Sequence, residues 1–320
     1  MPQIATVFPM RFGSTVALAL IIMSSLPAGL RAATGAGPDA YGHTAGTIPI
    51  AFEDLSVPGS GAVTVLDTAD DSAVTVSLGF PFVFYGTAYT SISISSNGIV
   101  TFGGIDTDWD PVDFTNDSPA ANRPTIAPLW HDWTYQYFGS DAVYYVTRGN
   151  PGNRRFIVHW SAPLSDTGPG EDTVNFEVKL FEGTNNIEFH YDDATVSDDA
   201  NVSNGKDATV GIRDINGQTN NRNLRWAYNQ AVINNDTAVR IVAPRFLVNS
   251  ITRLSNQHIV LQCVGAPSLA NKIEATTDLK NTPFAPLTPS VMANSAGSFQ
   301  FEDVNAGSFT RRFYRVAIPK

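Results

Sequence analysis

The chain has 320 residues, of which 43% are apolar, 16% are charged and one is a cysteine. This composition excludes a disordered chain, a collagen, a coiled coil and a disulfide-stapled scaffold. A formal net charge of −10 with only five scattered lysines excludes a clustered basic surface, so nucleic acid is not expected as a partner. Sparse charge combined with 11% aromatic residues favours strands buried on one face, and we therefore predict an all-β protein.

Residues 1–32 have the pattern of an export signal that is removed from the mature protein. Arg11 provides the positive charge, residues 16–26 form the apolar stretch, and Ala32 ends a small-residue cleavage site. Because the apolar stretch is short for a bilayer span, cleavage is the favoured interpretation, with a retained anchor as the alternative. No second long apolar run follows, so we expect a secreted or cell-surface protein without a membrane span after cleavage.

Three further regions follow the signal. Residues 33–47 are rich in Gly, Ala and small polar residues, which predicts a flexible leader. Residues 48–243 consist of short β runs broken by Gly, Asn, Asp and Pro, which predicts a large antiparallel β-sandwich domain. Residues 245–320 predict a smaller β-sandwich module, with strand-like runs at 259–264, 272–276, 298–302 and 313–318.

Aromatic residues alternate along two of the predicted strands. In the first, Phe80, Phe82 and Phe84 share one face, which predicts that they line a core. Pro81 has no N–H to donate, which indicates a sheet edge or a strand start. In a later strand Phe156, Val158 and Trp160 repeat the alternation, and His159 is expected to point to solvent or to a polar neighbour.

Two hairpins are predicted down to their register. In the run 91–104, Ile94 matches Val100 only if 96–98 form a three-residue loop with Gly98 in a left-handed conformation. In the run 173–193, a two-residue turn with Gly183 at its first central position is favoured over a register two residues longer, because it pairs opposite charges. These solvated cross-strand pairs are Lys179 with Glu188 and Glu177 with His190.

The order of these motifs indicates a family. The runs LGFPFVFYGTAYTSISISSNGIVTFGG, RPTIAPLWHDW and VNFEVKLFEGTNNIEFHY resemble the NIDO domain of nidogen, tectorin and related adhesive proteins over residues 64–242. The resemblance implies an extracellular, non-enzymatic module associated with cell-matrix adhesion, and it carries over no catalytic residue. The C-terminal runs IEATTDL and FEDVNAGSFTRRFYRVAIP resemble short β-modules that end many secreted bacterial surface proteins, which implies an accessory or attachment role.

An acidic stretch, GIDTDWDPVDFTND, follows the first hairpin. Carboxylates at alternate positions are able to converge on calcium when the chain curls into a loop. The EF-hand pattern fails because Pro111 replaces the turn glycine, so a solvated acidic loop with Asp in turns is the alternative. The candidate calcium ligands are Asp106, Asp108, Asp110 and Asp113, and no other cofactor is expected.

An aromatic run at 130–138 is a candidate ligand surface. Strand alternation sends its rings to both faces, and both faces belong to the core only if another layer covers the strand. Otherwise some of these rings are exposed and available to stack on sugars or apolar partners. The residues of this predicted patch are Trp130, Trp133, Tyr135 and Tyr137.

These observations favour a secreted, non-enzymatic adhesion or surface-interaction protein that binds an extracellular protein or a glycan surface through loops and exposed aromatics. The alternative is a carbohydrate-binding or hydrolytic jelly-roll protein that uses the 130–138 patch together with Glu177 and Glu188, which share a sheet face. Retaining hydrolysis needs two carboxyl groups about 5 Å apart in a cleft, so solvated pairing of these acids is favoured over catalysis. The lone Cys263 lies in an apolar strand pattern and predicts a buried thiol.

Overall fold

A computed structural model describes residues 36–115, 123–135, 141–165, 172–215 and 220–318. Their regular structure consists of antiparallel strands and two short 3-10 turns, at Ser203–Gly205 and Ala306–Ser308. The all-β prediction is confirmed. Within the described ranges no helix is long and apolar enough to cross a membrane. The predicted signal at residues 1–32 lies outside the described residues.

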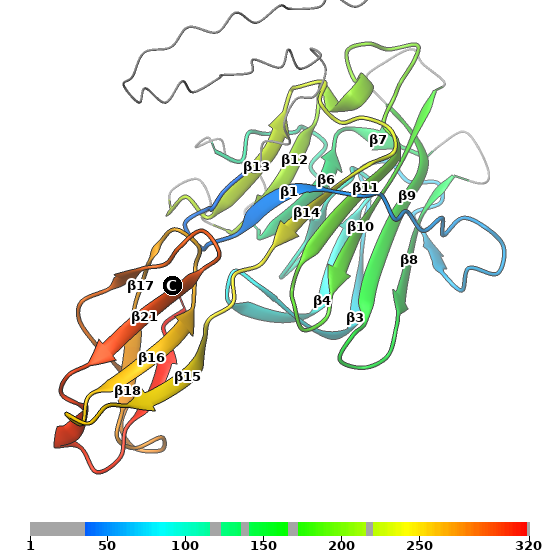
Figure 1. Cartoon of the computed structure of the whole chain (residues 1–320). Helices are drawn as coiled ribbons and strands as arrows, with labels where there is room; N and C mark the ends of the chain where they lie inside the picture. The colour runs from blue at the N-terminus through cyan, green and yellow to red at the C-terminus, as the bar shows by residue number, and fades with distance from the viewer. Residues whose placement is uncertain (1–35, 116–122, 136–140, 166–171, 216–219, 319–320) are drawn as a thin grey trace, which may run out of the picture. The chain divides into compact units, whose positions relative to one another are not determined.

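The larger of the two main sheets has the strand order β1-β14-β11-β10-β9-β8-β2, with β7 paired to β9 (Figure 1). Every strand pair in it is antiparallel. Its strands are β1 (Thr44–Ile48), β2 (Val63–Val65), β7 (Trp133–Thr134), β8 (Ala142–Arg148), β9 (Arg155–Ser165), β10 (Thr173–Phe181), β11 (Ile187–Asp193) and β14 (Thr237–Val242).

The second main sheet has the order β13-β12-β6-β5-β4-β3. Its strands are β3 (Ala73–Phe84), β4 (Thr87–Ser95), β5 (Val100–Thr101), β6 (Thr125–Trp130), β12 (Thr209–Arg213) and β13 (Asn223–Tyr228). Residues from both sheets enclose one apolar core, so the predicted large β-sandwich is present. The predicted face of Phe80, Phe82 and Phe84 is buried in that core, and Pro81 lies on the edge strand β3, as predicted.

Both predicted hairpin registers are confirmed. In β10 and β11, Glu177 is opposite His190 and Lys179 is opposite Glu188. Gly183 has φ of +78°, as its predicted turn position requires, although the turn closes with an Asn185 N–H donating to the Phe181 carbonyl. In β4 and β5, Ile94 is opposite Val100, and Gly98 has φ of +70°.

The predicted flexible leader is wrong for the described residues from 36 onward. Thr44–Ile48 form β1, which pairs with β14 at the edge of the larger sheet. Asp39 holds the chain before it, because one carboxylate oxygen accepts the N–H groups of Tyr41, Gly42 and His43. Burial acts to raise the pKa of Asp39, but hydrogen bonds from His43 and Tyr85 outweigh it and lower the pKa. Small residues occur in tightly packed turns as well as in flexible segments. Composition alone therefore does not distinguish the two.

The C-terminal strands make three small sheets, β15-β16-β21, β17-β20 and β19-β18-β22. They are β15 (Leu247–Arg253), β16 (Ile259–Val264), β17 (Ala270–Asn271), β18 (Ile273–Thr276), β19 (Ala285–Pro286), β20 (Val291–Met292), β21 (Ser298–Asp303) and β22 (Phe313–Val316). Four of these match the predicted runs. A separate apolar cluster lies among them and includes Cys263, which is buried as predicted, and this burial raises the pKa of its thiol to about 11.

Replacing Gly98 with Ala tests why this hairpin needs a glycine. A Cβ at Gly98 would lie 2.1 Å from the Leu129 carbonyl oxygen, in addition to the cost of a positive φ. Gly103 provides a matched control, because its φ is +77° and an added Cβ would meet nothing within 4 Å. We expect Gly103→Ala to lower the free energy of unfolding by about 1 kcal/mol and Gly98→Ala by at least about 2 kcal/mol more, in urea denaturation. Equal losses would contradict the backbone clash.

Candidate functional site

Three polar side chains form a row across the outer face of the larger sheet. His190 on β11, Glu177 on β10 and His159 on β9 are direct cross-strand partners. Strand alternation sends their neighbours Phe176, Val178 and Trp160, among others, to the core, so the row faces away from it. All three row residues are nevertheless completely buried. A further part of the chain must therefore cover this face.

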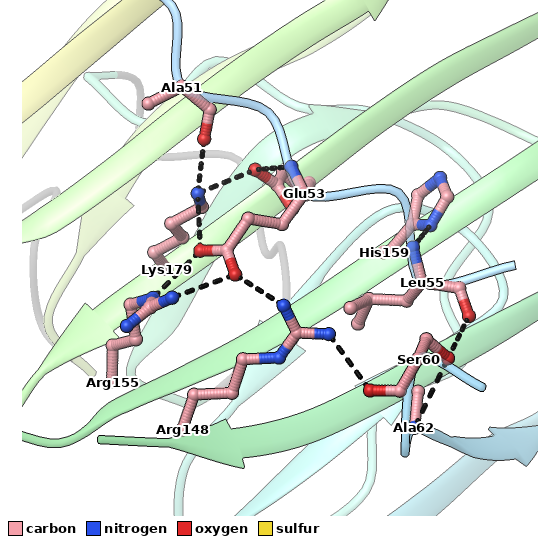
Figure 2. Close-up of polar contacts among 10 residues, drawn as sticks. Ala51, Glu53, Leu55, Ser60, Ala62, Arg148, Arg155, His159 and Lys179 are labelled. Atoms are coloured by element: carbon pink, nitrogen blue, oxygen red, sulfur yellow. Dashed lines mark hydrogen bonds and ion pairs between the residues drawn. The ribbon is translucent and has the colours of Figure 1, made fainter. Parts of the chain in front are cut away.

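The cover is a non-regular segment, residues 49–62, which we call the crossing segment. It passes over the sheet between β1 and β2, as the light blue chain in Figure 2 shows near Ala51, Glu53 and Leu55. Its alternate backbone N–H groups are donated to the row: Ala51 N–H to His190 Nδ1 at 3.2 Å, Glu53 N–H to Glu177 Oε1 at 3.1 Å, and Leu55 N–H to His159 Nδ1 at 3.1 Å. Side chains of the sheet thus take the place of a neighbouring strand's carbonyl groups.

These contacts assign the tautomers of both histidines. Because Nδ1 accepts a backbone N–H in each ring, the ring proton is on Nε2. His159 Nε2 then donates to Asn175 Oδ1 at 2.5 Å, and His190 Nε2 donates to Glu188 Oε2 at 3.0 Å. Burial lowers the pKa of His159, which keeps its ring neutral and its Nδ1 available as an acceptor.

Beside the row, Glu53 of the crossing segment joins three basic side chains of the sheet (Figure 2). Its carboxylate accepts two hydrogen bonds from Arg155, at 2.7 and 2.8 Å. Arg148 donates to it at 2.7 Å and Lys179 at 2.9 Å. Burial acts to raise the pKa of Glu53, but the hydrogen bonds from Arg155 and Lys179 outweigh it and lower the pKa to about 2. The ionised Glu53 is thus a fixed anchor between the segment and the sheet.

Glu177 has the opposite protonation behaviour. Its burial raises the pKa to about 8, although Lys179 Nζ lies 3.1 Å from Oε1 and acts to lower it. Oε2 has no hydrogen-bond partner within the described part of the chain. At pH 7 the Glu177 carboxyl group is therefore mostly neutral. Glu53 and Glu177 are neighbours, yet they hold different charge states. Burial raises the pKa of Glu177, whereas at Glu53 the hydrogen bonds from Arg155 and Lys179 outweigh burial and lower the pKa.

The predicted solvated charge pairs are wrong, although their register is right. Lys179 contacts Glu53 and Glu177 instead of Glu188, and Glu188 pairs with Arg240 at 2.6 Å and with His190. Glu177 and Glu188 are both buried. The crossing segment accounts for the difference, because it brings in Glu53 and removes water from the face. Its sequence, PIAFEDLSVPGSGA, has no alternating pattern from which this contact is predictable.

The candidate calcium ligands lie in the loop after β5. Asp106 and Asp108 accept the N–H groups of Asp108 and Asp110, respectively, which are local turn contacts. Asp113 accepts from Thr115 N–H and pairs with Arg225. In the described residues, carboxylates within 4.8 Å of one another occur elsewhere, at Asp70, Asp71 and Asp132. These turn contacts fit the alternative of turn-forming aspartates, and the calcium site stays a prediction.

The same loop, residues 103–115, presents an exposed tryptophan that the sequence did not single out. Trp109 is 50% exposed and Ile105 is 48% exposed. The backbone beneath them is held in place: Trp130 Nε1 donates to the Asp108 carbonyl at 2.9 Å and Asn97 Nδ2 to the Thr107 carbonyl at 3.3 Å. A large aromatic side chain is therefore displayed next to a backbone that two hydrogen bonds hold at the preceding residues.

The predicted aromatic ligand surface is wrong for its described members. Trp130, Trp133 and Tyr135 are buried, with exposed fractions of 0%, 1% and 2%, and Tyr137 lies outside the described residues. Trp133 and Tyr135 belong to the main core. Trp130 faces the other way and packs in a small cluster with Phe114 from the 103–115 loop. The 103–115 loop is thus the additional layer that covers this face of the strand, which is why Trp130 is not exposed.

Comparison with known proteins agrees with this fold. The profile of the NIDO-related family matches residues 41–251, about two thirds of the chain, so the chain belongs to this family. The family resemblance predicted from the motifs is confirmed, and it indicates an extracellular adhesion-type domain. Neither a curated protein nor a solved structure matches the chain.

Neutralising Glu53 tests the anchor of the crossing segment. We expect Glu53→Gln to lower the free energy of unfolding by about 2 kcal/mol or more, since Arg148, Arg155 and Lys179 lose their shared carboxylate. Limited proteolysis should then cleave within residues 49–62. The neighbouring, exposed Asp54 is the matched control, and Asp54→Asn should change stability by less than about 0.5 kcal/mol. Resistance of Glu53→Gln to proteolysis would contradict the anchor.

Glu177 should make stability depend on pH. Its folded pKa of about 8 exceeds the ordinary 4.5, so the folded state binds the extra proton between these values and stability falls as pH rises, by at most about 1.4 kcal/mol per unit. Glu177→Gln does not titrate and should gain stability relative to the original chain between about pH 5 and pH 9, in urea titrations. For Glu188, burial acts to raise the pKa, but His190 and Arg240 lower it, so Glu188→Gln should show no such gain. Parallel pH profiles for the original chain and Glu177→Gln would contradict the buried proton.

Proposed function

We propose that this NIDO-related chain is a secreted, non-enzymatic adhesion or surface-interaction protein whose partner is an extracellular protein or a glycan surface. The predicted export signal at residues 1–32 supports secretion, and membership of the family supports an adhesive role. The partner contacts loops and rims of the sandwich, because the large aromatic side chains of its strands are used in the core.

The observation that carries the proposal is the display of Trp109. Tryptophan is among the residues that contribute most to protein interfaces, since it buries a large area with few rotatable bonds. Here the side chain is half exposed on a loop that Trp130 and Asn97 hold from below. Acidic neighbours, Asp108 and Asp110, add a polar rim. A half-exposed tryptophan on an anchored loop is the kind of side chain that a partner surface buries on binding.

Burial of the two acids weighs against the hydrolytic alternative. A retaining glycosidase needs its nucleophile and its acid at the floor of a cleft that substrate reaches. Glu177 is fully buried beneath the crossing segment, and Glu188 is held by Arg240 and His190. Glu177 is therefore not placed to meet a polymer while residues 49–62 cover it.

Binding assays on the mature chain test the proposal. The purified protein is passed over immobilised extracellular matrix proteins and polysaccharides, and the Trp109→Ala variant is compared on each surface that retains it. We expect the variant to bind at least about tenfold more weakly with an unchanged melting temperature. Phe309→Ala is the control, because Phe309 is 42% exposed but lies outside the family match. Equal binding by Trp109→Ala, or release of cleaved polysaccharide, would overturn the proposal.

A further inference from the structure

A cavity of about 460 Å³ lies near the start of β4, and its lining includes Gly103 but neither Trp109 nor any residue of the crossing segment. Ligand pockets commonly enclose about 300–1,000 Å³, so its size suits a small molecule or one or two units of a polymer. Aromatic and charged side chains line it together. The lining residues used below are Tyr89, Phe102, Arg123, Asp214, Asn220 and Arg222.

The apolar part of the lining is an aromatic pair. Tyr89 is opposite Phe82 in the ladder of β3 and β4, and its ring stacks on Phe102 with centroids 4.5 Å apart and an angle of 26°. Phe102 is buried, whereas Tyr89 is only partly buried. One side of the Tyr89 ring is therefore backed by the core. A supported ring that borders a cavity is a platform for a flat apolar surface.

The polar part of the lining contains two arginines that differ in whether a carboxylate neutralises them. Arg222 is neutralised by Asp214 at 3.0 Å and lies over the Tyr41 ring at 5.2 Å. Arg123 donates one hydrogen bond, at 3.1 Å, to the neutral Gly103 carbonyl, and it forms no ion pair with a described residue. Because a guanidinium carries five N–H donors, most of those of Arg123 remain for a ligand. The cavity is thus locally positive in a chain whose net charge is −10.

We propose that this cavity binds an acidic saccharide, a hexuronic acid unit of an extracellular polysaccharide. A pyranose ring presents a face of C–H groups that fits the Tyr89 platform, and its hydroxyl groups fit the Asp214 carboxylate and the Asn220 amide. The uronate carboxylate is the group that Arg123 binds, with the paired geometry that guanidinium and carboxylate favour. The inference rests on the proposed function, because it names the glycan that a surface-interaction protein of this kind would recognise.

The test uses the full mature chain and oligomers of galacturonate, glucuronate and mannuronate, titrated by calorimetry. We expect at least one of them to bind, and its methyl ester, which lacks the negative charge, to bind about tenfold more weakly or worse. Arg123→Ala should weaken binding of the acid by a similar factor and leave binding of the ester nearly unchanged. Arg253→Ala is the matched control, since it removes an exposed arginine from β15 and should not alter binding.

Several results would overturn the inference. They are failure of all three oligomers to bind at up to about 10 mM, equal binding of acid and ester, or equal loss with Arg253→Ala. If Arg123→Ala fails to fold, Arg123→Lys and the ester comparison still decide, because the ester needs no mutation. Failure here is separable from failure of the proposed function: binding to a matrix surface that depends on Trp109 but not on Arg123 would leave the adhesive role and remove the saccharide site.

Discussion

The arrangement of the larger sheet depends on one constraint, which is that the N–H groups of a chain segment lying across strands must find acceptors. The crossing segment has no neighbouring strand to supply carbonyl groups, and an unpaired buried N–H costs on the order of 1–3 kcal/mol. His190, Glu177 and His159 supply those acceptors because the register of β9, β10 and β11 aligns them. A shift of one residue in either pairing would send this row into the core.

Burial of that row determines which chemistry remains possible on this face. With the segment in place, Glu53 is ionised between two arginines and a lysine, while Glu177 holds its proton up to about pH 8. Carboxylates in different charge states are typical of enzyme active sites, but here the same separation arises in a structural contact. The perturbed pKa of Glu177 follows from the cover over it, and the cover also denies access to substrate. The recognition sites that we propose, the 103–115 loop and the cavity beside Tyr89, are therefore elsewhere on the molecule.

Local patterns predicted much of the sandwich. Some features depend on only a few neighbouring residues and are therefore predictable from the sequence. They include the shared face of Phe80, Phe82 and Phe84, the edge position of Pro81 and the left-handed conformation of Gly98. The pairing of Glu177 with His190 in register was readable as well, because a hairpin joins partners close in sequence. The Asp39 turn was missed, since small residues accompany both loose and tightly packed backbone.

The sequence by itself therefore determined the all-β class, the two hairpin registers and the family, because alternation and turn residues act over short stretches of chain. Only the tertiary structure decided what each polar or aromatic residue does. Glu53 meets Arg155 across 102 residues, and Trp130 is covered by Phe114 from a separate loop. Whether a side chain is a surface group or part of a core depends on such distant layers, and burial then sets its charge and its access to other molecules.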